Sequence, residues 1–363
     1  MITLNKLKQA ATAVRQYYTN FDVKVRSSID ILNLRAVPVS IDYNAPAREV
    51  ISIDGSYSVL WRSPRYPIWV AAARTAMIHR RYDNENIKIR EVANKYRDVL
   101  EVINTHEKTI LSGDSMEVID KDISDVDIQN FIHARSIKCD LETTLDIAQN
   151  HKNIAIFHDG SFAMINSKEN SPRREVWNAI KLIIDACKEN GNVFIGLSKD
   201  SGLRTINNIT NDESLLEYYS RQHPNFTGYY LIDEGQTTGA GSCFARLHPR
   251  ALKWMRLDFM YTPIMCIDEI IQLVACYSQV NDLPGTPFPP LTAHEVAVKV
   301  RQYKEIAEQQ FMKILQKEGL TSNDIIAGLT DVNGNLLTGT FHQHLDKFTE
   351  VKKGKSPGAG TIN

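Results

Sequence analysis

The sequence has no long apolar run and no excess of charge of either sign. A membrane-spanning helix needs roughly 20 consecutive apolar residues, and neither such a run nor the apolar centre of a signal peptide is present. Lys and Arg number 42 against 43 Asp and Glu, so the formal net charge is −1, which excludes the strong basic field of many small DNA-binding modules. We therefore expect a cytoplasmic protein without a membrane segment, whose contacts with any nucleic acid are local.

Cysteine is scarce, and the common glycine-rich nucleotide motifs are missing. The five cysteines are widely spaced and form no Cys-x-x-Cys pair, which argues against a zinc ribbon or a dithiol redox motif and favours buried, reduced thiols. Neither a dinucleotide-binding fingerprint nor a Walker P-loop occurs.

The chain is long enough to bury a large core, with 363 residues of which 43% are hydrophobic. Hydrophobic patterns with the periods of strands and of helices alternate along it, which predicts an α/β fold. We expect a main domain at 46–300 with a helical insertion at 83–130. It is flanked by helical segments at 1–45 and 301–330 and by a loosely ordered tail at 331–363.

The sequence Asp-Gly-Ser occurs twice, each time after a predicted buried strand. Asp54 follows the alternating stretch 49–53, and Asp159 follows the apolar stretch 153–157. A single Asp-Gly-Ser is commonly no more than a turn, because Asp and Ser bond their own backbone there. Two copies after buried strands instead predict two carboxylates that project from rigid elements toward a shared cleft.

A third acidic candidate, Glu142, lies on the predicted helix 17 positions before Asp159. Three converging carboxylates repel one another unless cations neutralise them, and their hard oxygen ligands suit Mn²⁺ or Mg²⁺. Two such ions about 3.5–4 Å apart can support hydrolysis of a phosphodiester. A second interpretation remains open for Glu142, namely an ion pair with Lys138 on a solvated helix face.

His294 and Lys199 are two further candidates. The sequence from Thr292 to Glu295 is typical of a capping box and predicts a helix that starts there and runs to about residue 317. His294 would then lie in the first turn, where its ring could bind a metal or transfer a proton. Lys199 follows the predicted strand 193–197 and could neutralise a scissile phosphate. Structural or surface roles remain the alternatives for both residues.

A stretch without acidic residues follows the first Asp-Gly-Ser. Between Ser56 and Tyr82, arginines interleave with aromatic residues, and this combination can clamp phosphates and stack on unpaired bases. The predicted DNA contacts are Trp61, Arg62, Arg65 and Tyr66. Because 68–78 also reads as a core strand, we expect Trp69 to be buried.

Taken in order along the chain, these motifs resemble those of the NurA nuclease family. The matching segments are Ile53 to Ser56, the helix with Glu142, His158 to Ser161, Ile195 to Lys199, and Pro287 to His294. The resemblance implies an RNase H-like (PIWI-like) mixed sheet flanked by helices, with helical appendages at both ends. It also implies a homodimer that encloses a DNA channel and docks to the hexameric HerA helicase. The implied activity is Mn²⁺-dependent exonuclease and endonuclease cleavage of single-stranded DNA and duplex ends in DNA end resection.

In this resemblance Asp54, Glu142 and Asp159 take the role of metal-binding carboxylates, and His294 is an active-site histidine. The family often has a tyrosine eight positions before that histidine, whereas this chain has Thr286. Two other classes stay open. One is a non-catalytic DNA-binding or scaffold subunit of a HerA complex, which Thr286 favours. The other is an ATP-using enzyme of the actin and sugar-kinase class, for which 239–241 is the candidate glycine-rich site.

Overall fold

The computed structural model describes most of the chain. The described residues are 4–32, 36–45, 47–63, 66–83, 88–119, 128–162, 172–198, 204–206, 211–236, 239–261, 265–279, 283–321 and 325. The predicted tail at 331–363 lies outside them. The helices are α1 (Leu4–Leu32), α2 (Ile128–Asn150), α3 (Pro172–Asn190), α4 (Asp212–Gln222), α5 (Ile267–Cys276), α6 (Phe288–Ala297), α7 (Lys299–Gln302) and α8 (Lys304–Lys317).

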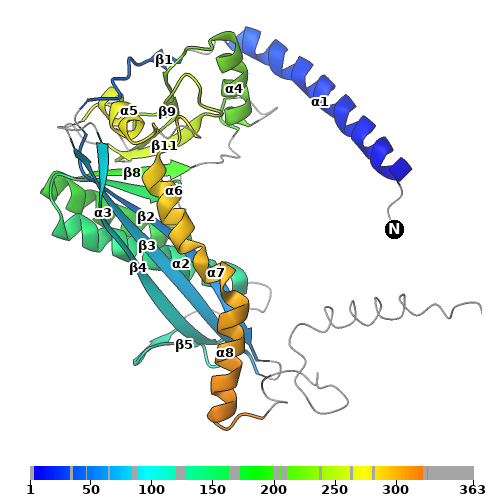
Figure 1. Cartoon of the computed structure of the whole chain (residues 1–363), viewed down its shortest axis with the longest axis vertical. Helices are drawn as coiled ribbons and strands as arrows, with labels where there is room; N and C mark the ends of the chain where they lie inside the picture. The colour runs from blue at the N-terminus through cyan, green and yellow to red at the C-terminus, as the bar shows by residue number, and fades with distance from the viewer. Residues whose placement is uncertain are drawn as a thin grey trace, which may run out of the picture. The chain divides into compact units, whose positions relative to one another are not determined.

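Eleven strands of the described residues form one mixed sheet. They are β1 (Val37–Pro38), β2 (Val50–Arg62), β3 (Ile68–Asp83), β4 (Lys88–Asn104), β5 (Thr109–Ser112), β6 (Ser115–Val118), β7 (Ala155–Asp159), β8 (Val193–Ser198), β9 (Gly228–Asp233), β10 (Ala240–Arg246) and β11 (Met255–Met260). Their order is β1-β9-β10-β11-β8-β7-β2-β3-β4-β5-β6, and Figure 1 shows the long strands β2, β3 and β4 side by side. At the centre, β2, β7 and β8 are parallel neighbours, whereas β11 pairs with β8 in antiparallel fashion. The predicted α/β class is confirmed.

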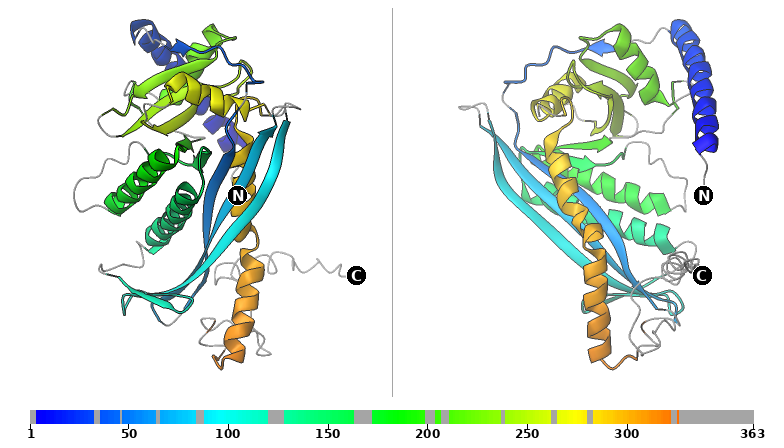
Figure 2. Two further views of the ribbon diagram at one scale, coloured as in Figure 1. Left: turned by 90° about the vertical axis from the view of Figure 1, so that its left-hand side faces the viewer. Right: turned by 45° about the vertical axis from the view of Figure 1, so that its right-hand side comes forward.

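Alternation along the central strands divides their side chains between two hydrophobic clusters. Phe157 and Leu197 face one cluster, together with the buried side of α5. Ile156 and Phe194 face the other cluster, which includes residues of α2 and α3. Figure 2 shows α2 and α3 side by side. Burial of one large apolar side chain contributes about 1.5–3 kcal/mol, so these two clusters hold the central strands rigidly in place.

The chain divides into two compact units, each built from three segments. The first contains Met1–Ser56, Arg74–Arg97 and His133–Val298, and the second contains Tyr57–Ala73, Asp98–Ile132 and Lys299–Asn363. The predicted boundaries instead follow the order of the sequence. Strands β2, β3 and β4 contribute residues to both units.

The predicted helical insertion at 83–130 is wrong. Its described residues form strands β4, β5 and β6 and the first turn of α2. Most side chains of β4 from Arg90 to Leu100 are exposed. Because this part of β4 buries neither of its faces, the period-two hydrophobic pattern that would have predicted a strand is missing.

The predicted single helix at 292–317 is also wrong, because α6, α7 and α8 occupy this region. The first of them begins at Phe288, with Pro287 as its N-cap residue and proline in its first turn. A proline is tolerated there because the first helical N–H groups have no partner within the helix. Thr292 lies inside α6, and its hydroxyl donates to the Phe288 carbonyl at 3.2 Å.

The sequence predicts buried cysteines and no membrane-spanning helix. Cys187, Cys243 and Cys276 are buried, whereas Cys139 is partly buried and Cys266 is exposed. No helix within the described ranges combines the length and the apolar character that a membrane span requires.

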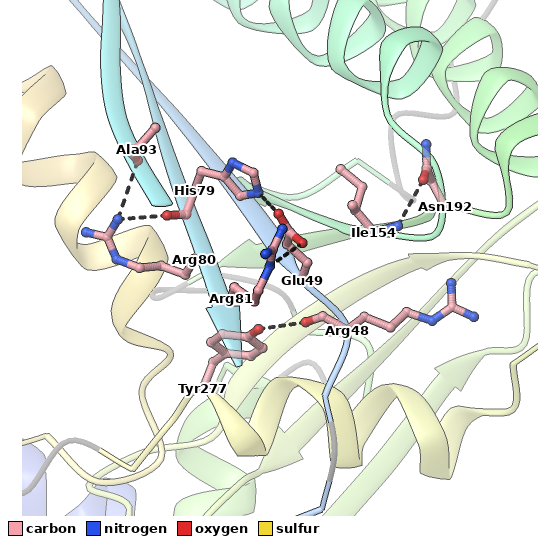
Figure 3. A network of polar contacts seen from close by, with 9 residues as sticks. All are labelled: Arg48, Glu49, His79, Arg80, Arg81, Ala93, Ile154, Asn192 and Tyr277. Atoms are coloured by element: carbon pink, nitrogen blue, oxygen red, sulfur yellow. Dashed lines mark hydrogen bonds and ion pairs between the residues drawn. The ribbon is translucent and has the colours of Figure 1, made fainter. Parts of the chain in front are cut away.

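A polar network joins β3 to the residues that precede β2 (Figure 3). The Arg81 Nε donates to one carboxylate oxygen of Glu49 at 2.9 Å, and the other oxygen contacts Nε2 of His79. Burial by itself would raise the pKa of Glu49, but the hydrogen bond from Arg81 and the charges of His79 and Arg81 lower it. Burial lowers the pKa of His79, and Glu49 opposes that effect. The Tyr277 hydroxyl donates to the Arg48 carbonyl at 2.6 Å.

Candidate active site

Asp54 and Asp159 lie side by side at the centre of the sheet. The parallel strands β2 and β7 pair Ile53 with His158, so the next residue of each strand is an aspartate at the same level. Asp159 ends β7, and Gly160 turns the chain with a φ of 133°, as predicted. Asp54 instead lies inside β2, which continues to Arg62, so the predicted turn at Asp54 is wrong.

His294 completes the group from α6. Its Nδ1 lies 2.7 Å from Oδ2 of Asp54 and 3.7 Å from Oδ2 of Asp159. It belongs to the last turn of α6 rather than the first. On the same helix, the small side chains of Ala293 and Ala297 pack against β3 at Ala76 and Ile78, which allows a close approach of the helix to the sheet.

The three side chains fit a divalent metal ion. One potential ligand atom from each of Asp54, Asp159 and His294 lies within 4.8 Å of the other two. The two carboxylates are largely buried, with 9% and 16% of their side chains exposed, whereas His294 is 52% exposed. Carboxylate oxygens suit Mn²⁺ and Mg²⁺, and an imidazole nitrogen is a common further ligand.

A further buried carboxylate, which the sequence patterns did not single out, lies against Gly55, the residue after Asp54. Asp140 of α2 is 7% exposed, and the Thr75 hydroxyl donates to its Oδ1 at 2.5 Å. The pKa of Asp140 is raised to about 7, mainly by burial. The hydrogen bond from Thr75 opposes this increase, and the charge of Asp54 adds to it. A carboxyl group in these surroundings ionises less readily than an exposed one.

Gly55 makes room for Asp140. A β-carbon at position 55 would lie 1.9 Å from an oxygen of Asp140, which is far inside van der Waals contact. The backbone of Gly55 is not in the left-handed region, so a turn does not require this glycine. It is required because the side chain of Asp140 approaches the backbone of β2 here.

Glu142 does not join this group. Its side chain is exposed on α2, and two positions along an α-helix correspond to a rotation of about 200°. Asp140 and Glu142 therefore point to opposite sides of α2. Asp140 shares the buried side with Ile137 and Leu141. A carboxylate among apolar neighbours, which is costly unless it is partnered, was the available signal for it.

The remaining predicted site residues are Lys199 and the four predicted DNA contacts. Lys199 and Arg65 lie outside the described residues. Trp61 is buried, and its Nε1 donates to the Ile325 carbonyl at 3.2 Å, so it is not an exposed stacking surface. Arg62 is exposed, with its guanidinium 4.4 Å from the ring of the buried Trp69. Tyr66 is exposed. These described residues belong to the second unit.

The glycines at 239–241 do not form a nucleotide loop in the described structure. Ala240 and Gly241 begin β10, and a β-carbon at Gly241 would lie 2.5 Å from the ring of Phe259 on β11. Close packing between strands therefore explains Gly241, which weakens the case for an ATP-using enzyme.

A mixed sheet with carboxylates on its parallel central strands, packed against α2 and α3, defines an RNase H-like fold. Comparison with known proteins agrees at the level of fold. No protein-family model matches the sequence, and no curated protein matches it either. The NurA nuclease from Sulfolobus solfataricus is structurally similar, with a TM-score of 0.55 and 16% identity over 87% of this chain and 98% of that chain. A second NurA structure has a TM-score of 0.51 and 10% identity over 79% and 93% of the two chains. The fold expected from the motifs is thus confirmed.

Proposed function

We propose that the chain is a metal-dependent DNA nuclease that hydrolyses phosphodiester bonds. The observation that carries this proposal is the convergence of Asp54 and Asp159, on the central strands of a NurA-like fold, with His294 of α6. Mn²⁺ or Mg²⁺, as two ions, would supply a water of lowered pKa and neutralise charge on the phosphate.

The buried carboxylates and the exposed His294 have different proposed roles. Asp54 and Asp159 would hold the metal from rigid strands, and Asp140, which accepts a hydrogen bond from the Thr75 hydroxyl, would add a third carboxylate. His294 keeps its Nδ1 toward Asp54, so Nε2 on the other side of the ring is free to accept the proton that the attacking water loses. The exposure of His294 suits contact with substrate.

We further propose both exonuclease and endonuclease cleavage of single-stranded DNA and duplex ends, in end resection in the cytoplasm. The proposed partners are a HerA-type hexameric helicase and a second copy of the chain. The sequence motifs support this proposal. The exposed apolar residues of α1 support the proposed partners; among them are Leu4, Leu7, Val14 and Tyr18. The proposed DNA contacts are Arg62 and Tyr66, together with Arg65, and Lys199 is proposed to contact the scissile phosphate.

The direct test is cleavage of single- and double-stranded DNA with Mn²⁺ by the wild type and by Asp54→Ala and Asp159→Ala. We expect each variant to lose more than about 100-fold in rate, because groups that merely support metal ligands already contribute about 10–100-fold. Asp185→Ala, which removes an exposed carboxylate of α3, is the matched control and should cleave normally. Undiminished cleavage by both site variants would show that the active site lies elsewhere.

One observation favours a second candidate, a DNA-binding or scaffold subunit. Thr286 stands where the resembling family often has a tyrosine, in the turn before α6. This candidate predicts DNA binding in a gel-shift assay without strand scission, even when a HerA-type helicase and Mn²⁺ are added. Cleavage that appears only with the helicase would support a partner-dependent nuclease instead.

A further inference from the structure

A buried ion pair lies on β11, two strands away from Asp159. The Nε of Arg256 donates to Oδ1 of Asp258 at 2.9 Å, and its Nη2 donates to Oδ2 at 3.1 Å. The side chains are 4% and 0% exposed. Removing two charges from water is costly, and a well-packed apolar pair would often be as stable. Stability alone therefore does not account for this pair.

Asp258 also holds the backbone that follows Asp159. Its Oδ2 accepts the N–H of Phe162 at 2.5 Å, and Phe162 lies three residues after Asp159. At the other end of this turn, the N–H of Gly160 donates to the Leu197 carbonyl on β8 at 2.8 Å. The turn is thus tied at one end to β8 and at the other to a charged group of β11.

Gly196 leaves the space in which this turn lies. It pairs with Asp258 across β8 and β11, and a β-carbon on it would lie 2.6 Å from the Gly160 carbonyl oxygen and 2.7 Å from the Phe162 ring. The Phe162 ring stacks on Phe194, with centroids 4.5 Å apart and an interplanar angle of 9°. The carbonyl of Gly160 and the Phe162 ring therefore rest directly on the sheet.

We propose that the Arg256–Asp258 pair is a positioning device that fixes the carboxylate of Asp159 in the metal site. This inference rests on the proposed function. Arg256 binds both oxygens of Asp258 and so sets the direction of the oxygen that receives the Phe162 N–H. Metal-binding groups must be held to within about 0.5 Å, and a turn bonded at both ends to neighbouring strands meets that requirement.

The test measures binding of Mn²⁺ alone by calorimetry, without DNA, for the wild type and Asp258→Asn. An asparagine offers one oxygen, so it leaves either Arg256 or the Phe162 N–H facing an amide NH₂. We expect Mn²⁺ binding to weaken by about 10–100-fold, which is the usual effect of groups that support metal ligands. Thermal unfolding without metal gives the accompanying loss of stability.

Asp212→Asn is the matched control. Asp212 is another fully buried carboxylate, at the start of α4, and it accepts backbone N–H groups from Thr205 at 2.8 Å and Ile206 at 2.9 Å. Its substitution should lower the melting temperature and leave Mn²⁺ affinity unchanged. Equal Mn²⁺ affinity in the wild type and Asp258→Asn, with a lowered melting temperature, would overturn the inference by showing a purely structural pair.

A second variant tests the same pair, and the wild type tests the proposed function itself. If Asp258→Asn does not fold, Arg256→Lys carries the comparison, because lysine keeps the charge but loses the planar fork. Weaker Mn²⁺ binding by this variant supports the inference, and unchanged binding overturns it. A wild type that binds no Mn²⁺ would instead remove the proposed function, and this inference with it.

Discussion

At the scale of single residues, Asp140 is the carboxylate that we propose in addition to those the sequence predicts. Its place follows from two contacts that no local pattern contains, the space left by the missing side chain of Gly55 and the hydrogen bond from the Thr75 hydroxyl, and the charge of Asp54 acts on it. A carboxylate in such surroundings is costly to ionise without a cation. The sequence predicts Glu142 instead, from its position 17 residues before Asp159, whereas the contacts that distinguish Asp140 come from residues of β2 and β3.

Asp140→Asn and Glu142→Gln separate the two carboxylates of α2. Because Asp140 is buried against Gly55 and feels the charge of Asp54, whereas Glu142 is exposed, we expect Mn²⁺ affinity to fall at least about 10-fold in the first variant and to stay unchanged in the second. Calorimetric titration of each variant with Mn²⁺ gives the comparison. The opposite order would assign the third carboxylate to Glu142.

At the scale of elements, the sequence predicts those parts of the site that local chemistry decides. Strand β7 ends at Asp159 because Gly160 adopts a left-handed backbone conformation, and an apolar run before Asp-Gly reveals such an end. The same Asp-Gly-Ser sequence at Asp54 does not end a strand, because Gly55 is needed to make room for the side chain of Asp140. The start of α6 was missed because proline, usually taken as a breaker, occupies its first turn.

The network that joins β3 to the start of β2 makes a prediction about pH. The pKa of His79 in the folded chain is below its usual value of 6.5, so the unfolded chain takes up this proton at a higher pH than the folded chain. Stability should therefore fall as pH drops below about 6.5. Glu49, whose pKa is lowered from 4.5, loses its stabilising effect only at more acidic pH.

Thermal unfolding at pH 7.5, 6.5 and 5.5 measures this effect. We expect the melting temperature of the wild type to decrease more over this range than that of His79→Gln, which carries no titrating group at this position. Parallel curves for the two proteins would show that His79 does not contribute to the acid sensitivity.

At the scale of the whole molecule, the order of the strands could be predicted only through resemblance. The parallel pairing of β2 with β7 joins residues about one hundred positions apart, and such pairings leave no local signal. Strand β4 could not be predicted from local sequence either. Most of its side chains are exposed, so its sequence lacks the alternation of apolar and polar residues that is typical of a strand. The likeness to NurA structures confirms the fold at 16% identity.

Helix α1 provides a test of assembly. Leu7 and Val14 lie on one side of it, with 54% and 53% exposure, and apolar residues at such spacing are typical of helices that pack on a partner. We expect the double variant Leu7→Glu/Val14→Glu to reduce the sedimentation coefficient by breaking self-association. Its Mn²⁺ affinity should remain that of the wild type.

The matched control for this test is Gln9→Glu/Gln16→Glu, which adds the same charge to the same exposed helix. Each of its positions is rotated by about 200° from the apolar one. This control should sediment like the wild type. If the Leu7→Glu/Val14→Glu variant also has the sedimentation coefficient of the wild type, α1 does not take part in self-association.

The contact between Gly55 and Asp140 bears on how relatives of this chain can be found. The two residues act as one unit in space, but the whole of β3 to β6 and the start of α2 separate them along the chain. A comparison that scores each position on its own counts one as an ordinary glycine and the other as an ordinary helix residue. A three-dimensional template of Asp54, Asp159 and Asp140 set against a bare glycine would recognise distant homologues whose sequences have diverged beyond alignment.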